Sequence, residues 1–146
     1  MRTKRLSWLA VALLAGLSGL ALLRAAADVN PASQRSADEW LALVDAGKYE
    51  DSWSRAHSLF KAQVTKEQWV AGATDLASRL GAMKSRKLKE AVATRSLPGA
   101  PDGDYTVFTY DSSYENLPAA TDTLVTATDT DGTWRVTGYF VKPAGQ

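Results

Sequence analysis

The chain has 146 residues, a formal net charge of +1 at pH 7 and no cysteine. That length suits a single domain with one hydrophobic core. The near-neutral charge argues against a nucleic-acid partner, which requires an excess of basic side chains on one face. The absence of cysteine excludes disulfides, thiolate metal sites and thiol nucleophiles.

The first 27 residues have the pattern of an export signal. Basic residues open this segment, an uncharged apolar run covers residues 8–23, and three alanines at residues 25–27 offer a cleavage site. The run is shorter than the roughly 20 residues of a membrane-spanning helix. We therefore predict a signal peptide at residues 1–27 and a periplasmic or secreted protein. The alternative is an uncleaved N-terminal segment that anchors the domain at the inner membrane, facing the periplasm.

Residues 28–36 are mostly small and polar, and we interpret them as a linker to a single domain at residues 37–143. Ser36 and Glu39 have the spacing of a capping box, which predicts a helix start. This first helix is expected to end at Gly47, since glycine favours the left-handed conformation that follows a helix.

A second helix is predicted over residues 49–58, and residues 59–64 are interpreted as a connector. Thr65 and Gln68 form another capping box, and the third helix is expected to end before Gly81. Apolar residues at three- and four-residue spacing give the helices apolar faces. Those faces need a partner surface.

After Gly81 the pattern changes from helical spacing to alternation, which predicts strands. We expect four of them, at residues 84–96, 105–114, 122–128 and 134–141, with a hairpin turn at residues 129–132. The first is rich in lysine and arginine and is interpreted as having a solvated face. In the last, alternation places Trp134, Val136 and Phe140 on one face and Tyr139 on the other.

Three helices followed by four antiparallel strands predict an α+β domain, with the helices packed on one face of a curved sheet. Such a half-cone can hold a pocket between sheet and helices. Residues 105–114 carry large apolar groups on both faces, so the second face is expected to need cover from a partner, a second copy or the N-terminus. A homodimer is the preferred expectation, although lysines on the neighbouring strand oppose edge pairing.

Five segments of the chain occur in the order of a known family: WLALVDAGKYEDSW, SLFKAQVTKEQWV, LGAMKSRKL, SLPGAPDGDY and DGTWRVTGYFV. Together they resemble the bacterial family DUF4019, and they span roughly residues 37–141, which is nearly the whole chain after the predicted signal peptide. The resemblance implies a small exported or anchored protein without assigned activity. The helical hairpin is also similar to nuclear-transport-factor-2-like (NTF2-like) domains, which implies an NTF2-like or cystatin-like cone. The family pattern is acidic at Asp122, usually glutamate, and aromatic at Tyr114, and it transfers no catalytic residue.

Charged and aromatic residues on the strands and the helical hairpin are the candidate ligand-binding residues of the expected pocket. They are Arg86, Tyr110, Tyr114, Asp122, Trp53 and Trp134. Arg86 and Asp122 are expected either to form an ion pair across the sheet or to anchor a ligand, since a guanidinium binds carboxylate or phosphate with two hydrogen bonds. The aromatic residues either line the cavity or fill the core.

No convergent catalytic or metal-binding set is present, and we predict no metal and no cofactor. His57 lacks companion ligands and is interpreted as a helix-surface residue, while Asp129 and Asp131 fit a turn better than a calcium loop. The sequence therefore favours an exported, noncatalytic module that binds a small ligand or a protein partner. The alternative is an isomerase or hydratase in which Asp122 is the base and Tyr110 the hydrogen-bond donor.

Overall fold

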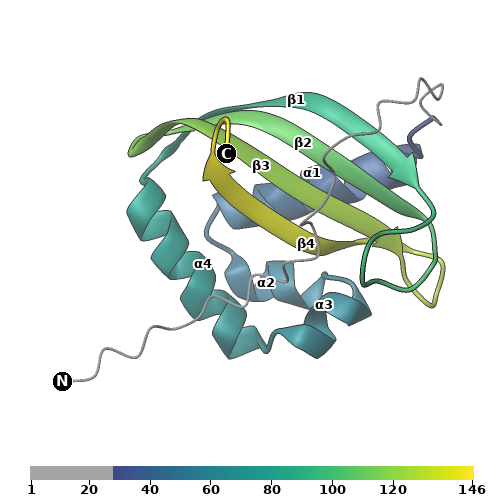
Figure 1. Cartoon of the computed structure of the whole chain (residues 1–146). Coiled ribbons are helices and arrows are strands. Elements are labelled where there is room, and N and C mark those ends of the chain that lie inside the picture. The colour runs from purple at the N-terminus through teal and green to yellow at the C-terminus, as the bar shows by residue number, and fades with distance from the viewer. Residues whose placement is uncertain (1–27) are drawn as a thin grey trace.

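The structure, a computed structural model, describes residues 28–146, and the predicted signal peptide at residues 1–27 lies outside them (Figure 1). Its elements are α1 Pro31–Asp45, α2 Tyr49–Ser54, α3 Ser58–Gln63, α4 Lys66–Leu80, β1 Met83–Thr94, β2 Tyr105–Tyr114, β3 Leu117–Thr128 and β4 Trp134–Pro143. The predicted α+β class, with helices on a curved antiparallel sheet, is confirmed. Within residues 28–146, no helix is both long and apolar enough to cross a membrane.

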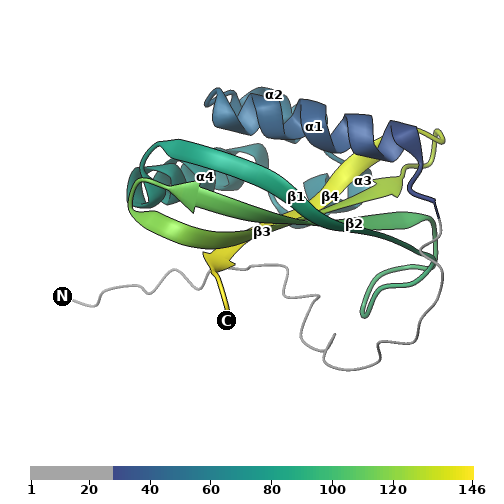
Figure 2. The same cartoon turned by 90° about the horizontal axis from the view of Figure 1, so that it is seen from above.

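The sheet is an antiparallel meander in the order β1-β2-β3-β4. Helix α1 lies across one face of it, called the inner face below (Figure 2). Phe108, Leu124 and Val136 are fully buried on the inner face and pack with Trp40 and Leu41 of α1. The predicted packing of helices on the sheet therefore forms the main core.

Helix α1 begins earlier than the sequence predicted. Asn30 is its N-cap, because the Asn30 side chain accepts a hydrogen bond from the backbone N–H of Ala32 at 2.9 Å. Pro31 occupies the first helical position, where its fixed φ suits a helix and its missing N–H is not needed. The prediction of a helix start at Ser36 is therefore wrong, and most of the expected linker is helical. The capping box of Thr65 and Gln68 is confirmed.

Residues 59–64 are not a connector: Ser58–Gln63 form a separate helix, α3, and Val64 is its C-cap. The helix predicted over residues 49–58 is wrong in its extent, because α2 ends at Ser54. His57 is the N-cap of α3: its Nδ1 accepts from the backbone N–H of Leu59 at 3.0 Å, and its Nε2 lies 3.1 Å from the carbonyl oxygen of Thr128. The ring is buried, with 6% of the residue exposed. The interpretation of His57 as a helix-surface residue was wrong, because the ring joins α3 to the end of β3.

A β-bulge reverses the alternation in β4. Val136 and Gly138 pair with consecutive residues of β3, so Thr137 is the extra residue. Every residue beyond a bulge lies on the face opposite to the one that strict alternation predicts. Tyr139 therefore points to the inner face and Phe140 to the opposite, outer face. The sequence alternation had placed Phe140 with Val136 and Tyr139 against them, which is wrong.

A second bulge lies in β1, where the register shifts between Leu88 and Glu90. Leu88 pairs with Tyr110, whose side chain is in the inner core, whereas Val92 pairs with Val107 on the outer face. The bulge therefore divides the apolar residues of β1 between the two faces.

The outer face of the sheet is partly covered by the chain itself. Leu97 and Ala100, in the loop between β1 and β2, pack on a small cluster formed by Tyr105, Val125 and Ala127. Figure 2 shows this loop on the side of the sheet away from α1. The loop therefore covers part of the outer face, for which the sequence predicted cover by a partner, a second copy or the N-terminus.

Candidate functional site

The inner face carries a polar network built from every strand and from the end of α1. It consists of Asp45, Arg86, Tyr114, Asp122 and Tyr139, called the inner network below. Oδ2 of Asp122 accepts from Tyr114 Oη at 2.6 Å, Tyr139 Oη at 3.0 Å and Arg86 Nε at 3.1 Å. The Asp122 side chain is fully buried. Three donors on one buried oxygen offset much of the cost of taking a carboxylate away from water.

Arg86 joins the network to α1. Its two terminal nitrogens donate to the two carboxylate oxygens of Asp45, at 2.7 and 3.1 Å, in a bidentate ion pair. Only 9% of the Arg86 side chain is exposed. One guanidinium between two carboxylates leaves one negative charge in excess, which the hydroxyl protons of Tyr114 and Tyr139 help to stabilise.

The surroundings raise the pKa values of Arg86, Tyr114 and Tyr139, which favours the protonated form of each. Burial alone would lower the pKa of Arg86, but its hydrogen bond to Asp45 and the neighbouring Tyr139 and Tyr114 raise the pKa above its ordinary value. Burial, with Asp122 nearby, raises the pKa values of Tyr114 and Tyr139. Arg86 therefore stays charged and both tyrosines stay protonated near neutral pH.

Several buried polar atoms beside the network lack a hydrogen-bond partner within the described residues. They are Oδ1 of Asp122, the Tyr110 hydroxyl and Oγ of Ser112. Tyr110 pairs with Asp122 across the β2–β3 ladder, and burial, together with Asp38, raises the pKa of Tyr110 to about 12. Since each of these atoms is closed off from solvent, the free lone pairs of Asp122 are out of reach of a dissolved molecule.

The structure brings together four of the six candidate residues and separates the two tryptophans. Arg86, Tyr114 and Asp122 are in direct contact, and Tyr110 adjoins them. Trp53 lies elsewhere, where its Nε1 donates to the carbonyl oxygen of Val64 at 2.8 Å and two lysine amines lie over its ring. Trp134 lies at the start of β4. The set predicted from sequence is thus not one pocket.

Trp134 lines a separate surface hollow of about 460 Å³, called the hairpin hollow below. Its walls are one side of α1, the end of α2 and residues 132–135 of the β3–β4 hairpin. Arg35 and Arg55 line it and form no ion pair within the described residues, whereas Arg135 is paired with Asp131 at 2.7 Å. The hollow therefore combines an indole ring with two uncompensated guanidinium groups, opposed by Glu39 alone.

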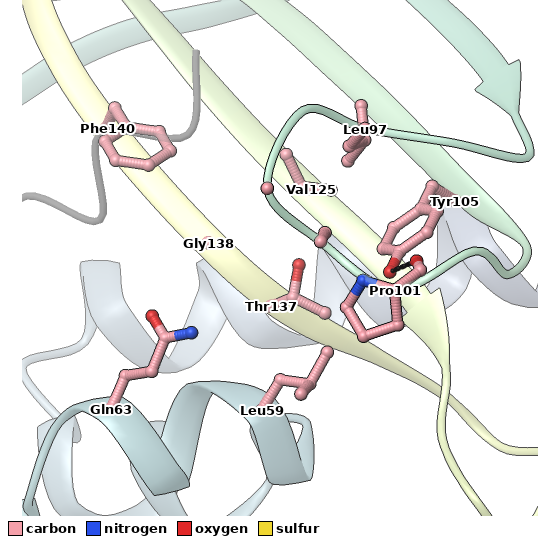
Figure 3. A pocket seen from close by; sticks show the side chains of 11 residues that line it. Leu59, Gln63, Leu97, Pro101, Tyr105, Val125, Thr137, Gly138 and Phe140 are labelled. Atoms are coloured by element: carbon pink, nitrogen blue, oxygen red, sulfur yellow. Dashed lines mark hydrogen bonds between the residues drawn. The ribbon is translucent and has the colours of Figure 1, made fainter.

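A smaller apolar pocket, of about 70 Å³, lies beside β4 (Figure 3). Leu59 and Gln63 of α3 form one wall, and the loop between β1 and β2 forms the other. Tyr105 is fixed there by a hydrogen bond from its hydroxyl to the carbonyl oxygen of Pro101 at 2.5 Å. This pocket has room for a single side chain but is too small for an ordinary metabolite.

His57, Ser58 and Asp129 lie together but do not form a nucleophilic triad. The Ser58 hydroxyl donates to Asp129 and not to His57, and His57 Nδ1 is used as the α3 cap. A catalytic serine must form a hydrogen bond with the histidine that acts as its base, and Ser58 does not. The three residues therefore serve as the cap of α3. Among residues 28–146, no group of three or more histidine or acidic side chains is placed to hold a metal ion.

The family described as "Protein of unknown function (DUF4019)" matches residues 36–139, which is most of the chain. The chain belongs to this family. No curated protein gives a significant match. Among solved structures, the DUF4019 chain is similar to a "putative ketosteroid isomerase" from Shewanella frigidimarina NCIMB 400, with 15% identity over 77% of this chain and 96% of that chain and a TM-score of 0.52. At that identity the likeness shows a shared NTF2-like fold, and it carries no chemistry.

Sequence reasoning missed two members of the inner network, Asp45 and Tyr139. Asp45 ends a helix 41 positions before Arg86, and nothing in the local pattern joins the two. Tyr139 was assigned to the wrong face because of the bulge at Thr137. Gly138 was an available signal, since a glycine inside a strand pattern often marks a bulge.

Proposed function

We propose that the chain is a noncatalytic module that binds a small ligand in the hairpin hollow. The closure of the inner network carries the proposal, because Asp122 is fully buried and three donors already occupy one of its oxygens. The hairpin hollow, by contrast, is open, and its volume of about 460 Å³ falls within the roughly 300–1,000 Å³ of ordinary ligand sites.

The rival function is an isomerase or hydratase that uses Asp122 as base and Tyr110 as donor. Asp122 does point inward, as that mechanism requires. However, a general base must come within about 3 Å of the proton it removes, and both Oδ1 of Asp122 and the Tyr110 hydroxyl are sealed from solvent. This closure supports the noncatalytic proposal. Export to the periplasm or beyond stays a prediction from the N-terminal pattern.

The proposal is tested by nuclear magnetic resonance of the full chain, titrated separately with benzyl alcohol, benzoate and benzylamine. We expect at least one ring compound to shift the backbone amides of Thr133, Arg135 and Arg55. Ser36→Phe, which fills the hollow from α1, should abolish those shifts. The matched control is Ala42→Phe, an exposed α1 residue outside the hollow, which should leave them intact.

Three results would contradict the proposal. The first is the absence of shifts with all three compounds. The second is a set of shifts that persists in Ser36→Phe. The third is a set centred on Asp122 and Tyr110, which would show that the interior opens to ligands and would favour the enzyme.

A further inference from the structure

The two edges of the sheet differ in how far the chain protects them. At β4, the backbone N–H of His57 donates to the carbonyl oxygen of Val136 at 2.8 Å, and α3 packs alongside. Strand β1 forms the other edge (Figure 1) and pairs only with β2. Within the described residues, no other segment forms a backbone hydrogen bond with Met83–Thr94. A 12-residue edge strand is thus open along its length.

The exposed large hydrophobic residues of the described chain all lie on this strand: Met83 is 38% exposed, Leu88 42% and Val92 42%. The bulge in β1 places Leu88 towards the inner face and Val92 towards the outer face. An added strand could therefore cover apolar surface on both faces of the sheet. An open edge with exposed apolar side chains is a template for pairing with another strand.

The charges along β1 indicate which strand fits. Lys84 and Lys87 form no ion pair within the described residues. Lys89 lies 3.7 Å from Asp111, with both side chains more than half exposed, so that this pair contributes little. Glu90 is the one acidic residue on the strand. Two copies of β1 would bring lysine-rich rows together, which is unfavourable, whereas an acidic strand would face complementary charge.

We propose that β1 is a docking strand for an extended acidic segment of a partner protein, which adds to the sheet as a fifth strand. Backbone hydrogen bonds would supply the affinity, and Leu88, Val92 and the lysines would supply the selectivity. This interaction goes beyond the proposed ligand site, because the hairpin hollow lies against β4, at the opposite edge of the sheet.

The test uses the full chain and three synthetic peptides: Glu-Val-Glu-Val-Glu-Val-Glu, the same peptide with lysine in place of glutamate, and the acidic peptide with its central valine changed to proline. Amide hydrogen exchange reports the site. We expect the first peptide to slow exchange at alternate residues of β1, and the other two to leave the exchange rates unchanged.

Lysine dependence is tested by the double variant Lys84→Glu/Lys87→Glu, with Lys48→Glu/Lys142→Glu as a control with the same change of net charge. Two surface ion pairs correspond to about a tenfold change in affinity. The first double variant should bind the acidic peptide about tenfold more weakly, and the control should bind it as the unchanged chain does.

Each alternative outcome overturns the proposal. No binding at about 1 mM peptide, equal binding of the acidic and basic peptides, or protection outside β1 would exclude an acidic docking strand. If β1 amides become protected as the concentration of the chain alone rises, the occupant is a second copy instead.

Discussion

At the scale of single residues, Asp122 shows how a buried charge can be structural. Side chains from β1, β2 and β4 donate hydrogen bonds to its carboxylate, so Asp122 links these three strands on the inner face. Networks of this kind add little net stability compared with an apolar replacement, yet breaking one partner is costly, because the other groups stay buried and unpaired. The inner network therefore enforces one arrangement of the sheet and of the end of α1.

Asp122→Ala should be strongly destabilising, whereas Asp45→Ala should not. Loss of Asp122 leaves Tyr114 and Tyr139 without their acceptor, and we expect the free energy of unfolding to fall by about 3–5 kcal/mol. Asp45 is 30% exposed, so water can replace it, and its loss should cost about 1 kcal/mol or less. Urea denaturation of both variants measures the difference. Equal losses would show that the network is not centred on Asp122.

The sequence revealed part of this network. Arg86 and Asp122 could be paired in advance, because each is a charge at a strand position otherwise suited to core residues. Asp45 could not be assigned, since its contact depends on where α1 crosses the sheet. Tyr139 could not be placed on the inner face while the alternation in β4 was read without a bulge.

At the scale of elements, Asp129 joins the short helix α3 to the β3–β4 hairpin. Its carboxylate accepts from the Ser58 hydroxyl, from the backbone N–H of Ser58 at 3.1 Å and from that of Thr130 at 2.8 Å. Arg135 lies 3.3 Å away. A helix of six residues has little stability of its own, so α3 depends on this joint and on the His57 cap.

The free energy of unfolding should fall at acidic pH because Asp129 becomes protonated. Desolvation alone would raise its pKa, but hydrogen bonds from Ser58 and Thr130 lower the pKa of Asp129 from 3.8 to about 2. A carboxylate with a lowered folded-state pKa stabilises the fold above its unfolded-state pKa, and this contribution disappears as the pH falls from about 4 to 2. The contribution is at most about 2 kcal/mol.

Asp129→Asn should remove that dependence. We expect urea midpoints of the unchanged chain to fall between pH 5 and 2 more steeply than those of the variant. Asp51→Asn, at an exposed position on α2, is the control and should follow the unchanged chain. Parallel curves for the unchanged chain and Asp129→Asn would rule out the joint as a source of the acid sensitivity.

The order and class of most elements could be predicted, whereas two kinds of local event could not. The first is the choice of helix start: Asn30 and Pro31 begin α1 although Ser36 and Glu39 offered a competing capping box, and His57 caps α3. The second is the set of register shifts in the sheet. The bulges at Thr137 and between Leu88 and Glu90 each add one residue and reverse the face of the residues beyond it, and further shifts lie between Met83 and Ser85 and between Ser112 and Tyr114. The alternation of faces along a strand therefore predicts side-chain direction only between bulges. Leu88 directly precedes the bulge in β1, and Phe140 lies beyond the bulge at Thr137 in β4.

Strand β3 shows how the whole sheet alters the expectation for a single residue. The sequence predicted this strand only from residue 122, yet β3 begins at Leu117 and includes Pro118. Strand β4 ends at Pro143, opposite Ala120, so β3 has no neighbour on that side at Pro118. A missing N–H is tolerated where no partner strand needs it.

At the scale of the whole molecule, the outer face of the sheet is the surface through which we expect the chain to self-associate. Leu97 and Ala100 cover the end of this face near Tyr105, but Val107 and Thr123 remain partly exposed nearer its centre. The homodimer predicted from the sequence would use this remaining surface, because the lysines of β1 oppose pairing of two edges. The homodimer stays a prediction.

We expect light scattering on the full chain to give a mass that rises towards that of a dimer as concentration increases to about 100 μM, the range in which an association of about −5.5 kcal/mol becomes visible. Thr123→Arg places a charge on the outer face and should keep the chain monomeric. Thr130→Arg, in the exposed hairpin turn, is the control and should dimerise normally. Lys84→Glu/Lys87→Glu should also dimerise normally, since β1 is not the expected contact.

A constant monomeric mass up to about 100 μM would contradict the dimer. Dimerisation that survives Thr123→Arg would show that the contact lies away from the outer face.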